Sequence, residues 1–191
     1  GSQITADHIL FFNGIADAVD KVYELVHRNA RILLPTPVYS THSSNEAKRG
    51  GYDNLFFHLD PNNGWLPDTD EIRLKVKYNP TIAGIGLVNP DNPTGFVYPE
   101  PVLREIVDIA RQNDLFLICD EIYAHICYNG RPPCHLSSLV GNDVKAIVMR
   151  GISKEYPWPG ARCGWIEVLN ADRDDVFKEY VRSILDAKRL E

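Results

Sequence analysis

The sequence has few cysteines and no regular cysteine spacing, which argues against a protein stabilised by disulfides. Its 191 residues include four cysteines, and these are scattered along the chain. One of them, Cys119, lies inside an apolar run of strand length. Thiols used in this way are typical of a reducing compartment. We therefore expect a cytoplasmic protein.

An excess of basic residues and a long apolar run are both absent. The formal net charge is −6, so the sequence predicts no nucleic-acid partner and no attachment to an anionic membrane surface. No apolar run reaches the roughly 18 residues of a membrane-spanning helix, and no secretory signal peptide is recognised. Gly1 and Ser2 are interpreted as a remnant of expression cloning, which leaves residues 3–191 as the domain.

Two glycine-rich phosphate loops are also missing. Neither the dinucleotide motif GxGxxG nor the ATPase motif GxxxxGK(S/T) occurs. The second absence matters because Leu115–Glu121, read LFLICDE, has the form of an ATPase strand that carries a magnesium-binding carboxylate. Without the phosphate loop, the ATPase interpretation is set aside.

A standard zinc motif is absent as well. Cys127 and Cys134 lie close to His125 and His135 in the sequence. Their spacing matches no standard zinc pattern, although a metal site is conceivable. Ordinary surface and core thiols are the simpler interpretation, and no metal is expected.

Apolar runs of strand length alternate with stretches of helical period, which predicts an α/β fold. The composition is 44% hydrophobic and 24% charged, and the length suits one domain with a sizeable core. Most of the apolar runs are continuous, as expected for strands covered on both faces. The predicted strands are Ile9–Phe12, Arg31–Leu34, Asn54–Leu59, Ile82–Val88, Leu115–Cys119, Val144–Met149 and Cys163–Val168. The predicted helices include Val19–Val26, Val102–Ala110 and Ala171–Lys188.

This alternation predicts a three-layer α/β/α domain with a mostly parallel seven-stranded sheet. The stretch between Met149 and Cys163 is too short for a helical crossover. We therefore expect Cys163–Val168 to run antiparallel to its neighbour.

Polar motifs follow five of the predicted strands at their carboxyl ends. In open α/β sheets, binding sites form at this edge. The motifs are Asn13-Gly14, Pro35–Tyr39, Asn89–Gly95, Asp120 and Arg150–Lys154. Five motifs at one edge are harder to obtain by chance than any one of them, and we expect a functional site there.

Two of these motifs could position a ligand through the backbone or an amide. Asn13-Gly14-Ile15-Ala16 joins a strand to a helix, and the amide groups at a helix N-terminus attract phosphate. A glycine turn without a ligand is also common at such a place. The segment Asn89–Gly95, read NPDNPTG, contains two Asn-Pro pairs, which stiffen the loop enough to orient an asparagine side chain. A plain strand-to-helix turn is the alternative.

Two further motifs carry charge. Asp120 ends a buried strand, where a carboxylate costs several kcal/mol unless cations or donors meet it; a helix N-cap is the simpler interpretation. Lys154 follows another strand, with Arg162 eight residues later. An amine beside a guanidinium suits an anion-binding site with a nucleophile. Most lysines are solvated surface charges, however, and Arg150 and Arg162 could be ordinary ion-pair partners.

Taken together, NPDNPTG, DEIY and SKxxxxPGxRxGW resemble the pyridoxal-phosphate (PLP) enzymes of the aspartate aminotransferase superfamily, fold type I, class I/II. The three motifs occur in the order of that family, and the predicted sheet agrees with its large domain. The resemblance covers essentially the whole chain.

The resemblance implies a role for each residue at the reacting end of the cofactor. Lys154 would form the Schiff base with PLP. Asp120 would pair with the pyridine nitrogen, supported from behind by His42. Asn92 and Tyr123 would bond the phenolic oxygen. The catalytic residues implied are therefore Lys154, Asp120 and Tyr123.

The resemblance also implies how the rest of the cofactor would be held. Arg162 would bind the phosphate, helped by backbone groups of Ile15 and Ala16. Ser153 is a further phosphate contact. Tyr39 resembles the aromatic residue that stacks on the cofactor ring.

For function, the resemblance implies transfer of an amino group between an amino acid and a 2-oxo acid, in a homodimer. The N-terminal segment and C-terminal small domain of the family are not recognised, so we expect a truncated, inactive form of such an enzyme. Two alternatives stay open: a PLP-dependent carbon–sulfur lyase of the same fold, and an aminotransferase-like sensor domain of a transcription regulator.

Overall fold

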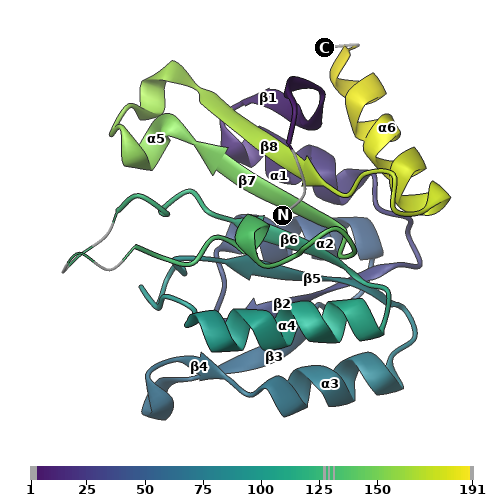
Figure 1. Ribbon diagram of the computed structural model, residues 1–191, viewed down its shortest axis with the longest axis vertical. Coiled ribbons are helices and arrows are strands. Elements are labelled where there is room, and N and C mark those ends of the chain that lie inside the picture. Colours follow the sequence, from purple (N-terminus) through teal and green to yellow (C-terminus); the bar gives the residue numbers. More distant parts are fainter. Residues whose placement is uncertain (1–3, 127, 129, 131, 190–191) are drawn as a thin grey trace.

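A mixed sheet lies at the centre of the computed structural model, which describes residues 4–126, 128, 130 and 132–189 (Figure 1). Its strand order is β1-β8-β7-β6-β5-β2-β3-β4. The eight strands found in this part of the chain are β1 Ile9–Asn13, β2 Arg31–Thr36, β3 Leu55–Asp60, β4 Leu66–Pro67, β5 Ile82–Val88, β6 Phe116–Asp120, β7 Ala146–Gly151 and β8 Cys163–Leu169. The α/β prediction is confirmed, and the short edge strand β4 is added to the seven strands expected.

The direction of the strands follows from the lengths of their connections. Strands β3, β2, β5, β6 and β7 are parallel to their neighbours in that order. Strand β8 runs antiparallel to both β7 and β1, as predicted. Between β7 and β8 the chain forms only α5, Ile152–Glu155, and one 3-10 turn, Pro159–Ala161. So short a segment returns the chain to the same end of the sheet, which forces the reversal.

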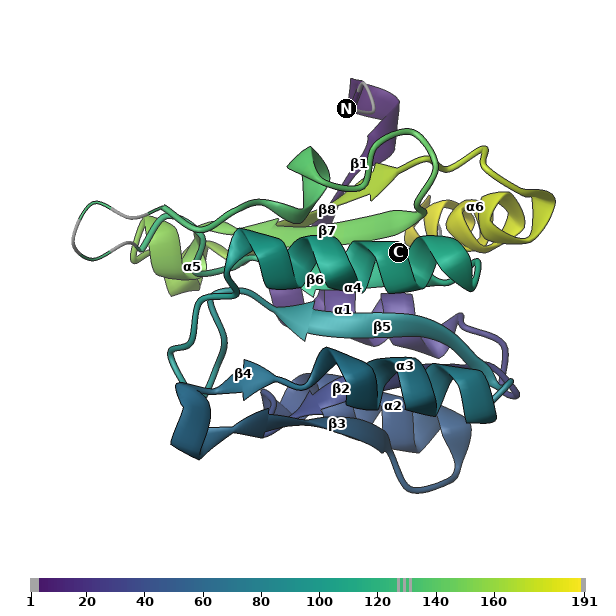
Figure 2. The same cartoon turned by 60° about the horizontal axis from the view of Figure 1, so that its bottom comes forward.

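Helices cover both faces of the sheet and enclose two apolar cores. Helices α3, Thr69–Tyr78, and α4, Glu100–Gln112, pack on one face, in front of the sheet in Figure 2. Helices α1, Ile15–Glu24, and α6, Asp175–Arg189, pack on the other face. Helix α2, Ser40–Gly50, lies beside α1. The central strands β5 and β6 are buried on both sides, which explains their continuous apolar sequence.

Two helices lack the apolar repeat that predicts a helix from sequence. Helix α2 buries His42, Glu46 and Gly50, so its inward face is polar. Helix α3 buries only Ile72 and Val76. Both are held by specific contacts instead of a broad apolar stripe. The carboxylate of Asp68, for example, accepts hydrogen bonds from the first-turn amides of α3.

Three statements about absence apply to the described residues alone. None of their helices combines the length and apolarity that crossing a membrane requires. They contain no group of three or more His, Cys, Asp or Glu side chains placed to hold a metal ion. Their cysteines, Cys119, Cys134 and Cys163, are free thiols. The predictions that concern Cys127 and the first two residues fall outside this part of the chain.

Candidate active site

Side chains from five separate segments line one cavity of about 260 Å³ at the carboxyl edge of the parallel strands. Every site residue predicted from the sequence lines it except His42, which lies directly behind Asp120. The lining residues are Ile15, Ala16, Tyr39, Val88, Asn92, Asp120, Ile122, Tyr123, Ser153, Lys154, Pro159 and Arg162. An amine, a carboxylate, a phenol and a guanidinium therefore border one space.

One end of this cavity is built to attract an anion. Helix α1 begins at Ile15, so its first amide groups face the cavity without intrahelical partners. The guanidinium of Arg162 lies beside them, where it donates hydrogen bonds to the carbonyl of Asn13 at 3.2 Å and to that of Pro159 at 3.0 Å. These two bonds hold the positive charge next to the helix N-terminus.

Two glycines permit this close approach. Gly14 has φ +82° and ψ 167°, a region that only glycine adopts readily. A Cβ atom there would also lie 2.7 Å from Cζ of Arg162. Gly164 on β8 packs against the start of α1, since a Cβ atom at this position would be 2.7 Å from the amide nitrogen of Ile15. The motif PGARCGW therefore needs its second glycine for backbone contact.

The wall of the cavity also contains a buried carboxylate. Asp120, the last residue of β6, is 2% exposed. One of its oxygens, Oδ2, lies 3.2 Å from Nε2 of His42, and the other, Oδ1, accepts a hydrogen bond from the amide of Ile122 at 3.0 Å. Nδ1 of His42 in turn lies 3.2 Å from the hydroxyl of Tyr23. Burial raises the pKa of Tyr23 well above its usual value, so this phenol stays protonated.

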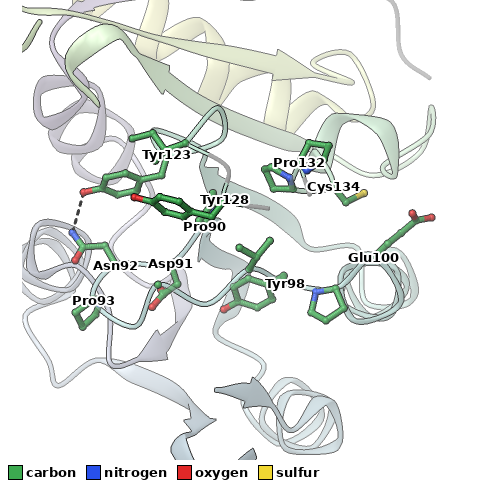
Figure 3. A pocket seen from close by; sticks show the side chains of 15 residues that line it. Pro90, Asp91, Asn92, Pro93, Tyr98, Glu100, Tyr123, Tyr128, Pro132 and Cys134 are labelled. Carbon is green, nitrogen blue, oxygen red and sulfur yellow. Dashed lines mark hydrogen bonds between the residues drawn. The ribbon is translucent and has the colours of Figure 1, made fainter. Parts of the chain in front are cut away.

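Asn92 and Tyr123 form a polar pair on the side wall. The amide of Asn92 donates a hydrogen bond of 3.4 Å to the Tyr123 hydroxyl, drawn as a dashed line in Figure 3. The pKa of Tyr123 is raised, mainly by burial and further by the negative charge of Asp120. The phenol is therefore a hydrogen-bond donor at neutral pH. The phenol oxygen and the amide point toward each other (Figure 3).

Lys154 belongs to the short helix α5, directly after β7. Its side chain lines the cavity from an exposed position, and Ser153 lines it from the same turn. The strand end is tightly packed below them. A Cβ atom at Gly151 would lie 3.0 Å from the Ile122 side chain and 3.1 Å from the Cys163 carbonyl. Tight packing at the end of β7 therefore fixes the backbone position at which α5, the helix that carries Lys154, begins.

Three lining residues, Val88, Ile122 and Pro159, were not predicted. They are apolar, and nothing in the sequence separates them from core positions. The same is true of Tyr23, which reaches the site only through His42. The spatial proximity of α1 and α2 brings it there.

A second and larger cavity, about 980 Å³, shares Asn92 and Tyr123 with the first (Figure 3). Its walls are mostly prolines and tyrosines, including Pro90, Tyr98 and Tyr128. It contains neither the lysine nor the arginine. Chemistry therefore belongs to the smaller cavity, and size alone does not identify the site.

Comparison with known proteins identifies the family of the chain. The family model for aminotransferase class I and II matches residues 1–188. An uncharacterized aminotransferase of Methanocaldococcus jannaschii is 54% identical over the whole chain, which spans 44% of that protein. The glutamate-pyruvate aminotransferase AlaA of Escherichia coli is 33% identical over 95% of the chain, again across 44% of its own length.

Solved structures give the same result. An alanine aminotransferase from Pyrococcus furiosus superposes with a TM-score of 0.88 at 29% identity, over all of this chain and 47% of that one. A PLP-bound C-S lyase from Staphylococcus hominis superposes with a TM-score of 0.82 at 25% identity, over 93% of this chain and 45% of that one. The chain belongs to the class I and II aminotransferase family, and it spans about half the length of the relatives it matches.

Proposed function

We propose that this chain is the cofactor-binding large domain of a PLP-dependent aminotransferase. The observation that carries the proposal is the shared cavity of Lys154, Asp120, Tyr123, Asn92 and Arg162. These residues come from separate segments of the sequence, and each has the chemistry that one part of PLP requires. The family membership of the chain supports the same assignment.

The donor set fits the cofactor. The phosphate is dianionic, and Arg162 together with the N-terminus of α1 forms a site for such a group. The pyridine nitrogen needs a carboxylate, and Asp120 lines the same cavity, buried, with His42 behind it. The phenolic oxygen needs donors, which Asn92 and Tyr123 supply. The ring would lie between them, beside Tyr39.

Each residue then has a defined task. When bound, PLP supplies an electron sink for the bond broken at the substrate α-carbon. Lys154 is the group that would hold the cofactor covalently, because an amine forms a Schiff base with an aldehyde. Once displaced, the same amine would act as the general base that moves the α-proton. The negative charge of Asp120 would keep the pyridine nitrogen protonated. We therefore propose that Asp120 controls the reactivity of the cofactor, whereas Arg162 contributes mainly to binding its phosphate.

The substrates we propose are an amino acid and a 2-oxo acid. A glutamate-pyruvate aminotransferase at 33% identity supports this class, without defining the side chain. We also propose that the protein works in the cytoplasm, as the free cysteines suggest, and as a homodimer, as the resemblance to the family implies.

The test is covalent trapping. The protein is mixed with PLP, reduced with borohydride and mapped by mass spectrometry. We expect the modification on Lys154 and its loss in Lys154→Ala. The control is Lys77→Ala, which removes a lysine that packs over Tyr78 on α3, away from the cavity. Modification spread evenly over surface lysines, or unchanged in Lys154→Ala, would contradict the proposal.

A carbon–sulfur lyase is the second candidate, favoured by the superposition on the PLP-bound C-S lyase. Both reactions use the same lysine and carboxylate, so the cavity does not separate them. The two differ in product. The test uses a protein that includes the remaining length of the family. Pyruvate released from a thioether amino acid without any 2-oxo acid present would favour the lyase, whereas pyruvate formed from alanine only when 2-oxoglutarate is added would favour the aminotransferase.

A further inference from the structure

Arg150 joins the three strands whose ends carry the candidate cofactor residues. It lies on β7, between β6 and β8, and its side chain is 15% exposed. One terminal nitrogen, Nη2, lies 3.0 Å from Oε2 of Glu121, the residue after β6. Its Nε lies 2.9 Å from Oε1 of Glu167 on β8. A single guanidinium thus bridges two carboxylates on opposite sides of its own strand.

Both carboxylates are themselves fixed. The side chain of Glu121 is 1% exposed, and it accepts hydrogen bonds from the amide of Leu136 at 2.9 Å and from the ring of His135 at 2.6 Å. It therefore ties together the two ends of the loop that carries Tyr123. Glu167 accepts a hydrogen bond from the indole of Trp165 at 3.2 Å. The guanidinium thus forms ion pairs with two carboxylates that also have other partners, while its buried Nε has no hydrogen-bond partner among the described residues. A lysine would keep the charge but has no planar group that spans both carboxylates.

The position of this cluster in the sequence gives it a consequence for the site. Glu121 follows Asp120 directly, Arg150 precedes Lys154 by four residues, and β8 begins next to Arg162. Neighbouring strand residues point to opposite faces, so Asp120 faces His42 while Glu121 faces Arg150. Asp120 is thus adjacent to Glu121 in the sequence, Lys154 follows Arg150 on the short helix after β7, and Arg162 directly precedes the strand that carries Glu167.

We propose that Arg150 is a positioning residue: through Glu121 and Glu167 it fixes the relative placement of Asp120, Lys154 and Arg162. Arg150 does not line the cavity. It acts through its ion pairs with Glu121, which follows β6, and with Glu167 on β8. The inference rests on the proposed function for its chemical meaning. The structural part of the inference is that Arg150 couples the segments 121–126 and 152–156. This coupling does not depend on whether the cofactor is PLP.

The experiment compares Arg150→Met, Arg150→Lys and the control Arg73→Met. Arg73 bridges Glu105 at 2.8 Å and Asp70 at 3.9 Å, on the helices away from the site. The first readout is hydrogen–deuterium exchange without added cofactor. In Arg150→Met we expect faster exchange in both segments, 121–126 and 152–156, and little change elsewhere. Arg73→Met should leave both segments as in the parent.

The second readout is the rate of PLP incorporation at Lys154, measured against PLP concentration with borohydride trapping. Loss of positioning by about an ångström lowers reaction rates roughly ten- to a hundredfold. We expect a fall of that size in the limiting rate for Arg150→Met, a smaller change in the half-saturating concentration, and partial rescue in Arg150→Lys. General loss of fold would instead lower both parameters and show in the circular dichroism spectrum.

The outcomes separate the two proposals. If the parent incorporates no PLP at Lys154, the proposed function fails, and the exchange data alone decide the role of Arg150. If Arg150→Met matches Arg73→Met in exchange and, where incorporation occurs, in limiting rate, the positioning role is overturned. Should Arg150→Met not fold, Glu167→Gln removes one arm only and is measured in its place.

Discussion

The ring of His42 lies between the carboxylate of Asp120 and the hydroxyl of Tyr23. Its two nitrogens are each 3.2 Å from one of these partners, and the three side chains are almost entirely buried. Because Asp120 also accepts the amide of Ile122, each of its oxygens has a partner inside the protein. The carboxylate therefore has a fixed orientation toward the cavity, whatever the cavity contains.

Asp120→Asn tests whether the negative charge of Asp120 contributes to PLP binding. An amide keeps the shape but carries no negative charge, so the charge-assisted contact with the pyridine nitrogen is lost. Such a contact contributes about 1.5–3 kcal/mol, and we expect PLP affinity to fall roughly ten- to a hundredfold. Equilibrium dialysis measures it. The exposed variant Asp108→Asn serves as control, and equal affinity in both variants would remove Asp120 from the proposed site.

Gly14→Ala tests the anion-binding end. The backbone conformation of Gly14 costs a residue with a Cβ about 1–3 kcal/mol, and the added methyl group would displace the Arg162 guanidinium. We expect lower stability in urea and weaker PLP binding. Gly64→Ala is the matched control, because Gly64 has φ +60° with nothing within 4 Å of a Cβ atom. That variant should lose stability and keep its PLP affinity; weakened binding there would mean that strain alone explains the result.

Asp91→Asn tests a pH dependence. Burial raises the pKa of Asp91 above its usual value, and Oδ1 has no partner among the described residues. Because the native state holds this proton to higher pH than the unfolded chain, the free energy of unfolding contributed by Asp91 falls as pH rises from the unfolded pKa through the folded one. The cost is absent at lower pH and complete above the folded pKa.

An asparagine side chain at this position would carry no charge to bury. We therefore expect Asp91→Asn to be more stable than the parent at neutral pH, by up to about 1 kcal/mol, with the difference shrinking as the pH approaches 4. Urea denaturation at several pH values measures this. The exposed variant Asp70→Asn provides the baseline, and an advantage that grows toward acid would reverse the sign and contradict the assignment.

Glu46→Ala tests the polar packing of α2. Glu46 is fully buried and lies 2.9 Å from Nε of Arg31 and 2.6 Å from Nη2 of Arg49, and it also accepts the amide of Ile32. Its removal leaves the buried Arg31 without its carboxylate, and breaking a buried pair costs about 3–5 kcal/mol. Calorimetry should show a large fall in melting temperature. Glu24→Ala, at an exposed pair with Lys21, should change little.

Whether a helix or strand could be predicted from the sequence depended on which of its side chains are buried. The strand Ile82–Val88 is predicted at both ends because it is apolar throughout and buried on both faces. Helix α2 is not predicted, because it buries a histidine and a glutamate that periodicity does not recognise. Strand β4 has only two residues, too few for any pattern.

The candidate site also has a part that the sequence predicts and a part that it does not. The polar residues that line the cavity were predicted from three motifs and a resemblance, whereas the lining residues Val88, Ile122 and Pro159 were not; the chemical roles stay predictions. The Arg150 cluster is not predicted by the sequence, where Arg150 belongs to the motif Arg150–Lys154 and its simpler interpretation is an ordinary ion-pair partner. Its partners Glu121 and Glu167 become neighbours of Arg150 only after β7 pairs with β6 and β8.

The sequence by itself determined the fold class and the antiparallel return of the last strand, and it supplied the candidate site residues that the cavity brings together. These depend on local patterns: apolar runs, connection lengths and short motifs. Only the tertiary structure decided that Asp120 is backed by His42 and Tyr23, and that Arg150 on β7 contacts carboxylates from both neighbouring segments, Glu121 after β6 and Glu167 on β8. Such contacts join residues far apart in the chain, and they exist only where strand order and helix packing bring their backbones together.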